Sequence, residues 1–376
     1  MSNIGLEGDV KKLGFGLMRL PKIGEEIDVE QTKKMVDMFM EARCTYFDTA
    51  WAYAGSEVAM RKALVERYPR ESFTVATKNA AWINCKTRED AIKQFETSLE
   101  QSGAGYFDFY LLHNLGQQRT KVFEDFEMWD FVKEMKAAGK IRHIGFSFHS
   151  NAEELEEILK AHPEAEFVQL QINYADWEDP DIQSKRVYEM ARKYGKPVII
   201  MEPVKGGLLA NPPEGVKHVL DAYNPDVSYA SWAVRFAASL EGVFVVLSGM
   251  SNVEQMENNL SYMTDFQKLS SDELKVIEEA RAEIAKIPLI PCTKCDYCAK
   301  VCPKNIGISG TFDAMNLLKV YNNKERAQNQ EHNTVVYPGK GRANECIKCG
   351  KCEAACPQHI AIREYLSEAA AALGME

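Results

Sequence analysis

Eight of the ten cysteines form two copies of one pattern, and each copy has the spacing Cys-x-x-Cys-x-x-Cys-x-x-x-Cys-Pro. A run with this spacing binds [4Fe–4S] clusters, with three cysteines on one cluster and the fourth on the other cluster. The pattern therefore predicts two clusters with crossed ligands. One would be held by Cys292, Cys295, Cys298 and Cys356, and the other by Cys346, Cys349, Cys352 and Cys302. Zinc is the rival metal, although zinc sites use separate sets of four ligands.

The repeat extends beyond the cysteines. Residues 302–308 (Cys-Pro-Lys-Asn-Ile-Gly-Ile) match residues 356–362 (Cys-Pro-Gln-His-Ile-Ala-Ile), with two isoleucines at the same offsets. Apolar side chains there can shield a cluster from water and tune its potential. The two copies resemble the halves of a dicluster ferredoxin. They are separated by a long spacer, in which apolar spacing predicts a helix over 311–326.

The composition limits the classes of partner. The chain has 376 residues and a formal net charge of −10, which argues against nucleic acid and against an anionic membrane surface as partners. The N-terminus has no basic stretch followed by an apolar run, so we expect no secretory signal. No stretch approaches the ~18 apolar residues of a membrane span. Cysteines committed to clusters imply a reducing compartment, and we expect a soluble cytoplasmic protein.

The first 285 residues alternate short apolar runs with helical patterns, such as those over Thr87–Ser102 and Glu124–Ala138. This alternation predicts a (β/α)8 barrel, which typically needs about 250 residues. An open doubly wound sheet is the alternative, but the Gly-x-Gly-x-x-Gly turn that usually follows its first strand is missing. The expected strands are Gly14–Arg19, Thr45–Asp48, Phe73–Lys78, Phe107–His113, Ile141–Ser147, Phe167–Asn173, Pro197–Glu202 and Val243–Ser248.

Four polar side chains fall at or just after three successive strand ends: Asp48, Tyr53, Lys78 and His113. Barrel enzymes place their chemistry at the carboxyl ends of the strands, so we expect these side chains to face one another. Tyrosine near an ammonium and an imidazole is a candidate general acid, since such neighbours favour the phenolate and lower the pKa of the phenol from about 10. A buried Asp48 would neutralise and orient Lys78.

Four segments resemble the aldo/keto reductase family, in order and at the family's spacing: residues 47–57 (Phe-Asp-Thr-Ala-Trp-Ala-Tyr-Ala-Gly-Ser-Glu), 75–78 (Val-Ala-Thr-Lys), 110–113 (Tyr-Leu-Leu-His) and 144–147 (Ile-Gly-Phe-Ser). The resemblance covers residues 1–285. With its C-terminal region, the chain is similar to the ferredoxin-fused branch of the family. The resemblance implies a catalytic tetrad in which Tyr53 donates a proton to a substrate carbonyl, His113 orients that carbonyl, and Asp48 and Lys78 complete the set.

The resemblance also implies a nicotinamide site. Ser147 and Gln169 match the positions that hold the carboxamide, and Met201 stands where an aromatic residue commonly stacks on the ring. The loop and helix start from Ser248 and Gly249 to Asn258 and Asn259 match the part that binds the adenosine half. Gln255 and Ser248 replace the usual cations for an NADP 2′-phosphate, which leaves Arg19 and Lys205 as possible substitutes. We expect no strong preference for NADP over NAD, and a flavin stays open as well.

The two parts together suggest an iron–sulfur oxidoreductase of 1–285 (barrel) and 286–376 (ferredoxin-type domain). It would reduce or oxidise a carbonyl or alcohol substrate while the clusters carry electrons to or from the barrel site, with a redox protein as a possible partner. A nicotinamide moves two electrons as hydride whereas a cluster moves one, so the coupling needs a further device. The alternatives are a nicotinamide-dependent carbonyl reductase with structural clusters, and an electron-transfer module with an idle barrel.

Overall fold

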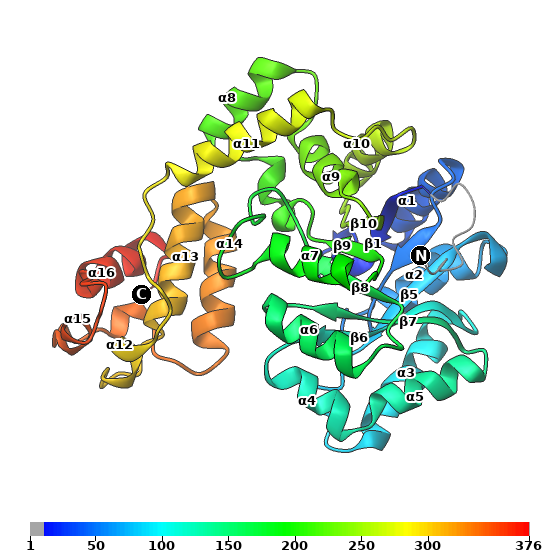
Figure 1. Ribbon diagram of the computed structural model, residues 1–376, viewed down its shortest axis with the longest axis horizontal. Coiled ribbons are helices and arrows are strands. Elements are labelled where there is room, and N and C mark those ends of the chain that lie inside the picture. The colour runs from blue at the N-terminus through cyan, green and yellow to red at the C-terminus, as the bar shows by residue number, and fades with distance from the viewer. Residues whose placement is uncertain (1–10, 376) are drawn as a thin grey trace. The chain divides into compact units, whose positions relative to one another are not determined.

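The computed structural model describes residues 11–375. The eight strands of its main sheet are parallel and close into a barrel in the order β1-β10-β9-β8-β7-β6-β5-β4 (Figure 1). The predicted (β/α)8 barrel is therefore confirmed. The strands are β1 Leu13–Gly16, β4 Tyr46–Asp48, β5 Thr74–Asn79, β6 Phe107–Leu115, β7 Ile141–Phe148, β8 Phe167–Gln171, β9 Val198–Met201 and β10 Val243–Ser248.

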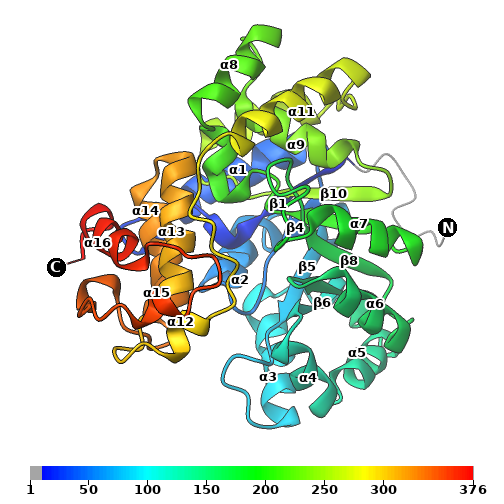
Figure 2. The ribbon, with the colours of Figure 1, turned by 60° about the vertical axis from the view of Figure 1, so that its left-hand side comes forward.

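Helices connect successive strands of the barrel (Figure 2). The strand interiors are apolar on both faces, as a parallel sheet covered by helices requires. A short antiparallel pair, β2 Lys22–Ile23 and β3 Glu26–Ile27, precedes the first helix. The connecting helices are α1 Val29–Glu41, α2 Ser56–Met60, α3 Arg88–Ser102, α4 Gln118–Asp125, α5 Met128–Ala137, α6 Ala152–Ala161, α7 Ser184–Lys193, α8 Glu214–Tyr223 and α9 Tyr229–Ser239. Two further helices, α10 Val253–Met263 and α11 Ser271–Ala285, follow the last strand of the barrel.

Large side chains fill the barrel interior. Tyr46 packs against Phe109 with ring centroids 5.2 Å apart, and Phe109 packs against Phe167 at 5.1 Å. Gly145 is needed beside them because a Cβ there would lie 2.6 Å from the Phe167 ring. The interior is thus a packed core rather than a pore, and it leaves chemistry to the rim.

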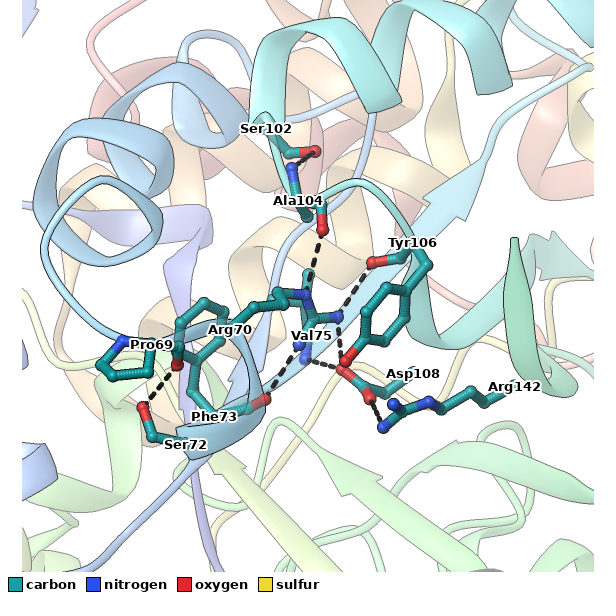
Figure 3. A network of polar contacts seen from close by, with 10 residues as sticks. All are labelled: Pro69, Arg70, Ser72, Phe73, Val75, Ser102, Ala104, Tyr106, Asp108 and Arg142. Atoms are coloured by element: carbon teal, nitrogen blue, oxygen red, sulfur yellow. Dashed lines mark hydrogen bonds and ion pairs between the residues drawn. The ribbon is translucent and has the colours of Figure 1, made fainter. Parts of the chain in front are cut away.

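Polar contacts tie together the amino-terminal ends of β5, β6 and β7, opposite the expected catalytic rim (Figure 3). Asp108 accepts hydrogen bonds from Arg70 at 2.7 Å, Arg142 at 2.7 Å and the Val75 amide at 2.9 Å. Arg70 also donates to three carbonyl oxygens, among them that of Tyr106. The Tyr106 ring packs against both guanidinium groups, at 3.8 Å and 4.3 Å.

We expect Asp108→Ala to lower the free energy of unfolding by about 3–5 kcal/mol, since removing one partner of a buried ion pair leaves the other uncompensated. The side chain of Asp108 is only 7% exposed. Asp130→Ala is the matched control, because Asp130 pairs with Lys133 on the surface and such pairs contribute little. Anaerobic denaturant titration of both variants measures the difference. Equal stability of the two would show that the network does not stabilise the barrel.

Three expected elements differ from those observed. The first strand ends at Gly16, and Leu17–Arg19 form a short 3-10 helix. The helix expected over Glu124–Ala138 is divided between α4 and α5 by Glu127, whose backbone is left-handed at φ 51°. The helix expected over 311–326 is divided between α13 Ile308–Tyr321 and α14 Lys324–Glu331. Asn322, at φ 47°, ends the first of these, and the Asn323 side chain caps the second by accepting from the Arg326 amide at 3.0 Å.

The chain divides into two compact units, and the second comprises residues 211–223 and 278–376. The second unit thus includes α8 and the end of α11, where Gly215 lies against the Glu283 side chain. Its other helices are α12 Tyr297–Lys300, α13, α14, α15 Lys351–Ala354 and α16 Ile362–Ala372. Within this unit α13 and α14 pack side by side, and α13 buries Phe312 and Met315 in a core shared with α16. None of the helices in residues 11–375 combines the length and the apolar character that crossing a bilayer requires.

Candidate redox site at the barrel rim and two cysteine-lined cavities

The four expected catalytic side chains meet at the carboxyl-terminal rim of the barrel. Asp48 ends β4, Lys78 lies near the end of β5, and His113 lies near the end of β6. Tyr53 reaches the same rim from the loop after β4, where its amide donates to the Ala50 carbonyl at 2.9 Å. Its carbonyl in turn accepts from the Ser56 amide at 3.0 Å, at the start of α2. This tight turn fixes the tyrosine relative to the strands.

Lys78 is the centre of a buried network. Its ammonium donates to Asp48 at 2.5 Å and to the Thr49 carbonyl at 2.7 Å, and the Tyr53 phenol is near enough to raise its pKa. Gln169, from the middle of β8, donates to the second oxygen of Asp48 at 3.2 Å. Lys78 and Asp48 are 1% and 3% exposed, so water cannot replace these contacts. The network fixes the Lys78 ammonium beside the Tyr53 phenol.

The electrostatics of Lys78 favour its charged form. Burial by itself would lower the pKa of the Lys78 ammonium, but Asp48 and Tyr53 raise that pKa above its ordinary value. A charged Lys78 beside the Tyr53 hydroxyl favours charge development on the phenol oxygen when its proton leaves. The ring of Tyr53 lies 5.0 Å from the ammonium.

The expected lowering of the Tyr53 pKa is wrong for the free site. Burial raises the pKa of the Tyr53 phenol above its ordinary value of 10.0, and the Lys78 charge offsets this only in part. The desolvation of a phenolate outweighs one ammonium partner here. Tyr53 therefore carries its proton at neutral pH, which is the state that a proton donor needs.

His113 is an electrically neutral neighbour. Burial lowers the pKa of its imidazole well below the ordinary value, and the nearby Lys78 charge adds to this effect. The ring meets Tyr53 edge-on, with centroids 5.8 Å apart. Its Nδ1 is buried without a hydrogen-bond partner among the described residues. A buried polar atom without a hydrogen-bond partner is unfavourable. A substrate group that bonds to Nδ1 would therefore be stabilised.

The residues expected to hold a nicotinamide lie around the same rim but are only partly free. The Ser147 hydroxyl accepts from the Asn114 amide at 2.7 Å and keeps its hydrogen for another acceptor. Gln169 has its amide nitrogen on Asp48, which leaves its carbonyl oxygen for a carboxamide. Met201 ends β9 and Ser248 ends β10, so both share this edge. The donor and acceptor set fits a carboxamide group.

The loop expected to bind the adenosine half runs from β10 into α10. Asn259 donates to the Gln255 carbonyl at 2.9 Å, and its own Oδ1 is buried without a partner among the described residues. That free acceptor fits an amino group such as that of adenine. Asn258 accepts from the Ser228 hydroxyl at 3.0 Å. Gly249 lies beside the end of β1, and a Cβ added there would make an ordinary contact with the Gly16 carbonyl oxygen at 3.9 Å.

Neither the start of α10 nor Lys205 offers a free phosphate site. The Gln255 side chain accepts a hydrogen bond from the Ser251 amide at 2.7 Å, so the helix start is closed by the chain itself. Lys205 forms an ion pair with Asp176, which is buried. Lys205 is therefore not a free substitute for the missing arginine. Arg19 lies in the 3-10 helix after β1.

One residue near the rim, Arg119, was not singled out from the sequence. Arg119, in α4, donates to the Asn114 carbonyl at 2.9 Å and lies 5.7 Å from the Trp82 ring, and it has no ion pair with any residue of 11–375. Trp82 in turn donates to the His113 carbonyl at 2.9 Å. The sequence indicates that Trp82 lies at the rim, because it follows the carboxyl end of the third expected strand. No feature of the sequence indicated that Arg119 lies near the rim, because only the folded loop after β6 brings it toward Trp82.

The eight cysteines of the second unit surround two separate cavities. One cavity is lined by Cys292, Cys295, Cys298 and Cys356. The other is lined by Cys302, Cys346, Cys349 and Cys352. Within residues 11–375 no three His, Cys, Asp or Glu side chains are arranged to hold a single metal ion. A set of four thiols around a cavity fits a [4Fe–4S] cluster, whose irons are each bound by one cysteine.

The backbone of the two cysteine loops repeats as the sequence does. Lys294 and Lys348, each two residues after the first cysteine, have φ of 54° and 56°. Asp296 and Gly350, each four residues after it, have φ of 55° and 76°. Such alternation of backbone conformation turns successive N–H groups inward and forms the concave anion-binding nests of many Fe–S sites. The short helices α12 and α15 follow at matching positions.

The isoleucines of the repeat line the cavities as well. Ile306 and Ile308 border the cavity of Cys302, while Ile360 and Ile362 border that of Cys356. Ile308 borders both cavities. All four side chains are buried, so they shield the thiols from water.

The comparisons with known proteins agree with this architecture. The model of the aldo/keto reductase family matches residues 12–282, and the chain belongs to that family. A model described as a 4Fe-4S dicluster domain matches residues 291–361. Both resemblances found in the sequence are thereby confirmed, and the chain is an oxidoreductase with an iron–sulfur domain.

Among curated relatives, the 9,11-endoperoxide prostaglandin H2 reductase of Trypanosoma cruzi is 26% identical over 274 residues, which cover 70% of this chain and 88% of that protein. Aldo-keto reductase str7 of Strobilurus tenacellus is 30% identical over 213 residues, which cover 53% of this chain and 60% of the relative. The match to str7 thus spans less than two thirds of that relative's length.

Solved structures share the barrel fold. An aldo-keto reductase from Bacillus halodurans, in its holo form, aligns with a TM-score of 0.58 and 23% identity over 72% of this chain and 92% of that one. An aldo-keto reductase from Klebsiella pneumoniae in complex with NADPH aligns with a TM-score of 0.56 and 19% identity, covering 72% of this chain and 90% of that one.

Proposed function

We propose that this chain reduces a small carbonyl compound to the alcohol, or runs the reverse reaction, with Tyr53 as the proton donor and with iron–sulfur clusters that carry electrons to or from the barrel site. The barrel domain would comprise 1–285 and the cluster domain 286–376. The observation that carries the proposal is the buried Asp48–Lys78–Tyr53 network at the rim. It supports an acid role because Tyr53 holds its proton and Lys78 stabilises the charge left behind.

Reduction of a carbonyl to an alcohol consumes two electrons and two protons in sum. Tyr53 would supply one proton to the carbonyl oxygen, and the free Nδ1 of the His113 ring suits a hydrogen bond to the same oxygen. In the alternative, nicotinamide-dependent reaction, a bound nicotinamide would supply a hydride, which brings both electrons with the remaining hydrogen, whereas two cluster electrons would require a second proton from solvent. Ser147, Gln169 and Asn259 are the residues whose free hydrogen-bonding atoms would hold it.

Cys292, Cys295, Cys298 and Cys356 would hold one [4Fe–4S] cluster, and Cys302, Cys346, Cys349 and Cys352 the other. Bound there, each cluster supplies one-electron chemistry. Two clusters in one chain can together store the two electrons that one carbonyl reduction needs. This match in number favours an electron-carrying role over a purely structural one.

A single-turnover experiment distinguishes the three functions. Anaerobically purified protein with dithionite-reduced clusters is mixed with a carbonyl substrate in the absence of nucleotide, and the visible absorbance of the clusters is followed. Reoxidation that depends on the substrate supports electron delivery from the clusters. Turnover only with added nicotinamide, at unchanged cluster absorbance, points to a nicotinamide reductase with structural clusters. No turnover under either condition points to an idle barrel. Mass analysis of released nucleotide identifies any bound flavin.

The nucleotide preference gives a separate prediction. We expect NADH and NADPH to bind with dissociation constants within about ten-fold of each other, because Gln255 closes the helix start and Lys205 is paired with Asp176. Each missing charge-assisted hydrogen bond to a 2′-phosphate is worth roughly 1.5–3 kcal/mol. Titration against tryptophan fluorescence measures both constants. Gln255→Arg should shift the preference toward NADPH by about ten-fold or more. An unaltered chain that binds NADPH a hundred-fold more tightly than NADH would contradict the prediction.

A further inference from the structure

The two cysteine-lined cavities differ in charge although their loops repeat. The cavity of Cys302, Cys346, Cys349 and Cys352 is also lined by Lys304, Ile347 and Arg363. The cavity of Cys292, Cys295, Cys298 and Cys356 is lined by Asp296 and by neutral residues, with no basic side chain among them. Part of this difference arises because Cys302, the fourth cysteine of the first run, lines the cavity of the second run. Lys304 follows Cys302 in the sequence and lines the same cavity.

Three lysines around the first of these cavities are free cations. Lys304, Lys348 and Lys351 are exposed, and none forms an ion pair with any residue of 11–375. Arg363, by contrast, is paired with Glu353 at 2.7 Å. Lys348 is also held close to the sulfur ligands, because its amide donates to the Cys346 sulfur at 3.4 Å.

The equivalent positions around the second cavity lack this charge. Lys294, the counterpart of Lys348, is paired with Asp313 at 3.1 Å. The counterpart of Lys351 is Tyr297, and the counterpart of Lys304 is Gln358. The repeat therefore keeps the cysteines and the backbone turns, while the counterparts of Lys304, Lys348 and Lys351 at the other cavity are uncharged or paired.

An apolar side chain lines the same cavity as Lys304 and directly precedes Lys348 in the sequence. Ile347 is 58% exposed, although it lines the cavity beside Cys346 and Cys349. Its counterpart in the other loop is the polar Thr293. A small apolar contact surrounded by charges of one sign suits a transient electron-transfer complex, because such interfaces are small and charge steers the encounter.

We propose that Lys304, Ile347, Lys348 and Lys351 form a docking face for an acidic one-electron carrier protein, and that electrons enter the chain at the cluster of Cys302, Cys346, Cys349 and Cys352. The reduced carrier loses one electron, the cluster gains that electron, and no bond or proton changes. The proposal rests on the proposed electron-carrying role of the clusters. It adds the place of entry and the charge of the partner: the free lysines attract an acidic carrier to this face, whereas the acidic remainder of the chain repels such a carrier. The formal net charge of the whole chain is −10.

The test uses the full cluster-loaded protein and a reduced flavodoxin, an acidic FMN carrier, as the probe. Lys348→Glu/Lys351→Glu reverses two charges of the face. Lys22→Glu/Lys62→Glu makes the same change in net charge on exposed lysines of the barrel that have no ion pair within 11–375. Stopped-flow spectroscopy measures the rate of cluster reduction, and calorimetry with oxidised proteins measures binding independently of electron transfer.

We expect the face variant to bind flavodoxin more weakly and to be reduced at least about ten-fold more slowly at low salt, since steering raises on-rates by about ten-fold or more. High salt should remove most of this difference. The barrel variant should match the unaltered chain. Reduction by methyl viologen, a cationic donor, should be as fast or faster in the face variant, which shows that its clusters are intact.

Equal binding and reduction rates in the face and barrel variants, with iron retained, would overturn the docking face but leave the proposed enzymatic function standing. Absence of iron in the unaltered chain would instead remove the proposed electron-carrying role. The iron content of every preparation therefore separates the two failures.

Discussion

Replacing Tyr53 by phenylalanine should lower the rate of carbonyl reduction by about 10²–10⁴-fold, the usual worth of a positioned acid. The variant keeps the aromatic ring beside Lys78 and His113 and removes only the hydroxyl that Lys78 contacts. Binding of the nucleotide should change little. Steady-state kinetics under anaerobic conditions, together with nucleotide titration, measure both quantities.

Tyr46→Phe is the control for this experiment. Tyr46 is fully buried inside the barrel, and its hydroxyl has no hydrogen-bond partner among the described residues. Its loss should leave the rate near that of the unaltered chain. In the unaltered chain the rate should fall only at a pH above the ordinary phenol pKa of 10.0, because burial raises the pKa of Tyr53 and the acid must be protonated to act. A near-normal rate in Tyr53→Phe would move the proton donor elsewhere.

Paired cysteine replacements should reveal the crossed ligation of the clusters. Anaerobic protein should contain about eight irons per chain if both cavities hold a four-iron cluster. Cys302→Ala/Cys349→Ala removes two ligands of one cavity and should leave about four irons. Cys295→Ala/Cys302→Ala removes one ligand from each cavity and should weaken or abolish both clusters.

Uncrossed ligation would reverse these two outcomes, because Cys295 and Cys302 belong to the same run whereas Cys302 and Cys349 do not. Cys85→Ala is the control, since Cys85 lies in the barrel unit outside both runs and should not affect iron content. Zinc in place of iron in the unaltered chain would refute the cluster assignment. Iron analysis and electron paramagnetic resonance of dithionite-reduced protein distinguish these cases.

The sequence alone was sufficient for the barrel and for the cysteine-rich domain. The alternation of apolar runs with helical spacing places Asp48, Lys78 and His113 near strand ends, and parallel strands that close into a barrel must bring such ends to one rim. The cysteine runs carry their own signal because cluster geometry dictates their spacing. The left-handed turns at Lys294 and Lys348 follow the same repeat, although lysine is not a residue type that predicts them.

The tertiary structure decided the features that depend on burial and on distant neighbours. Burial reverses the expected direction of the Tyr53 pKa, since the desolvation of a phenolate depends on every element packed around it. Lys205 is paired with Asp176, a residue far from it in sequence, and only the fold brings the two together. Likewise Lys304 belongs to the first cysteine run but lines the cavity of the second, because the chain crosses between the cavities at Cys302. Spacing can identify ligands, whereas the charge around a site comes from segments that meet only when the chain has folded.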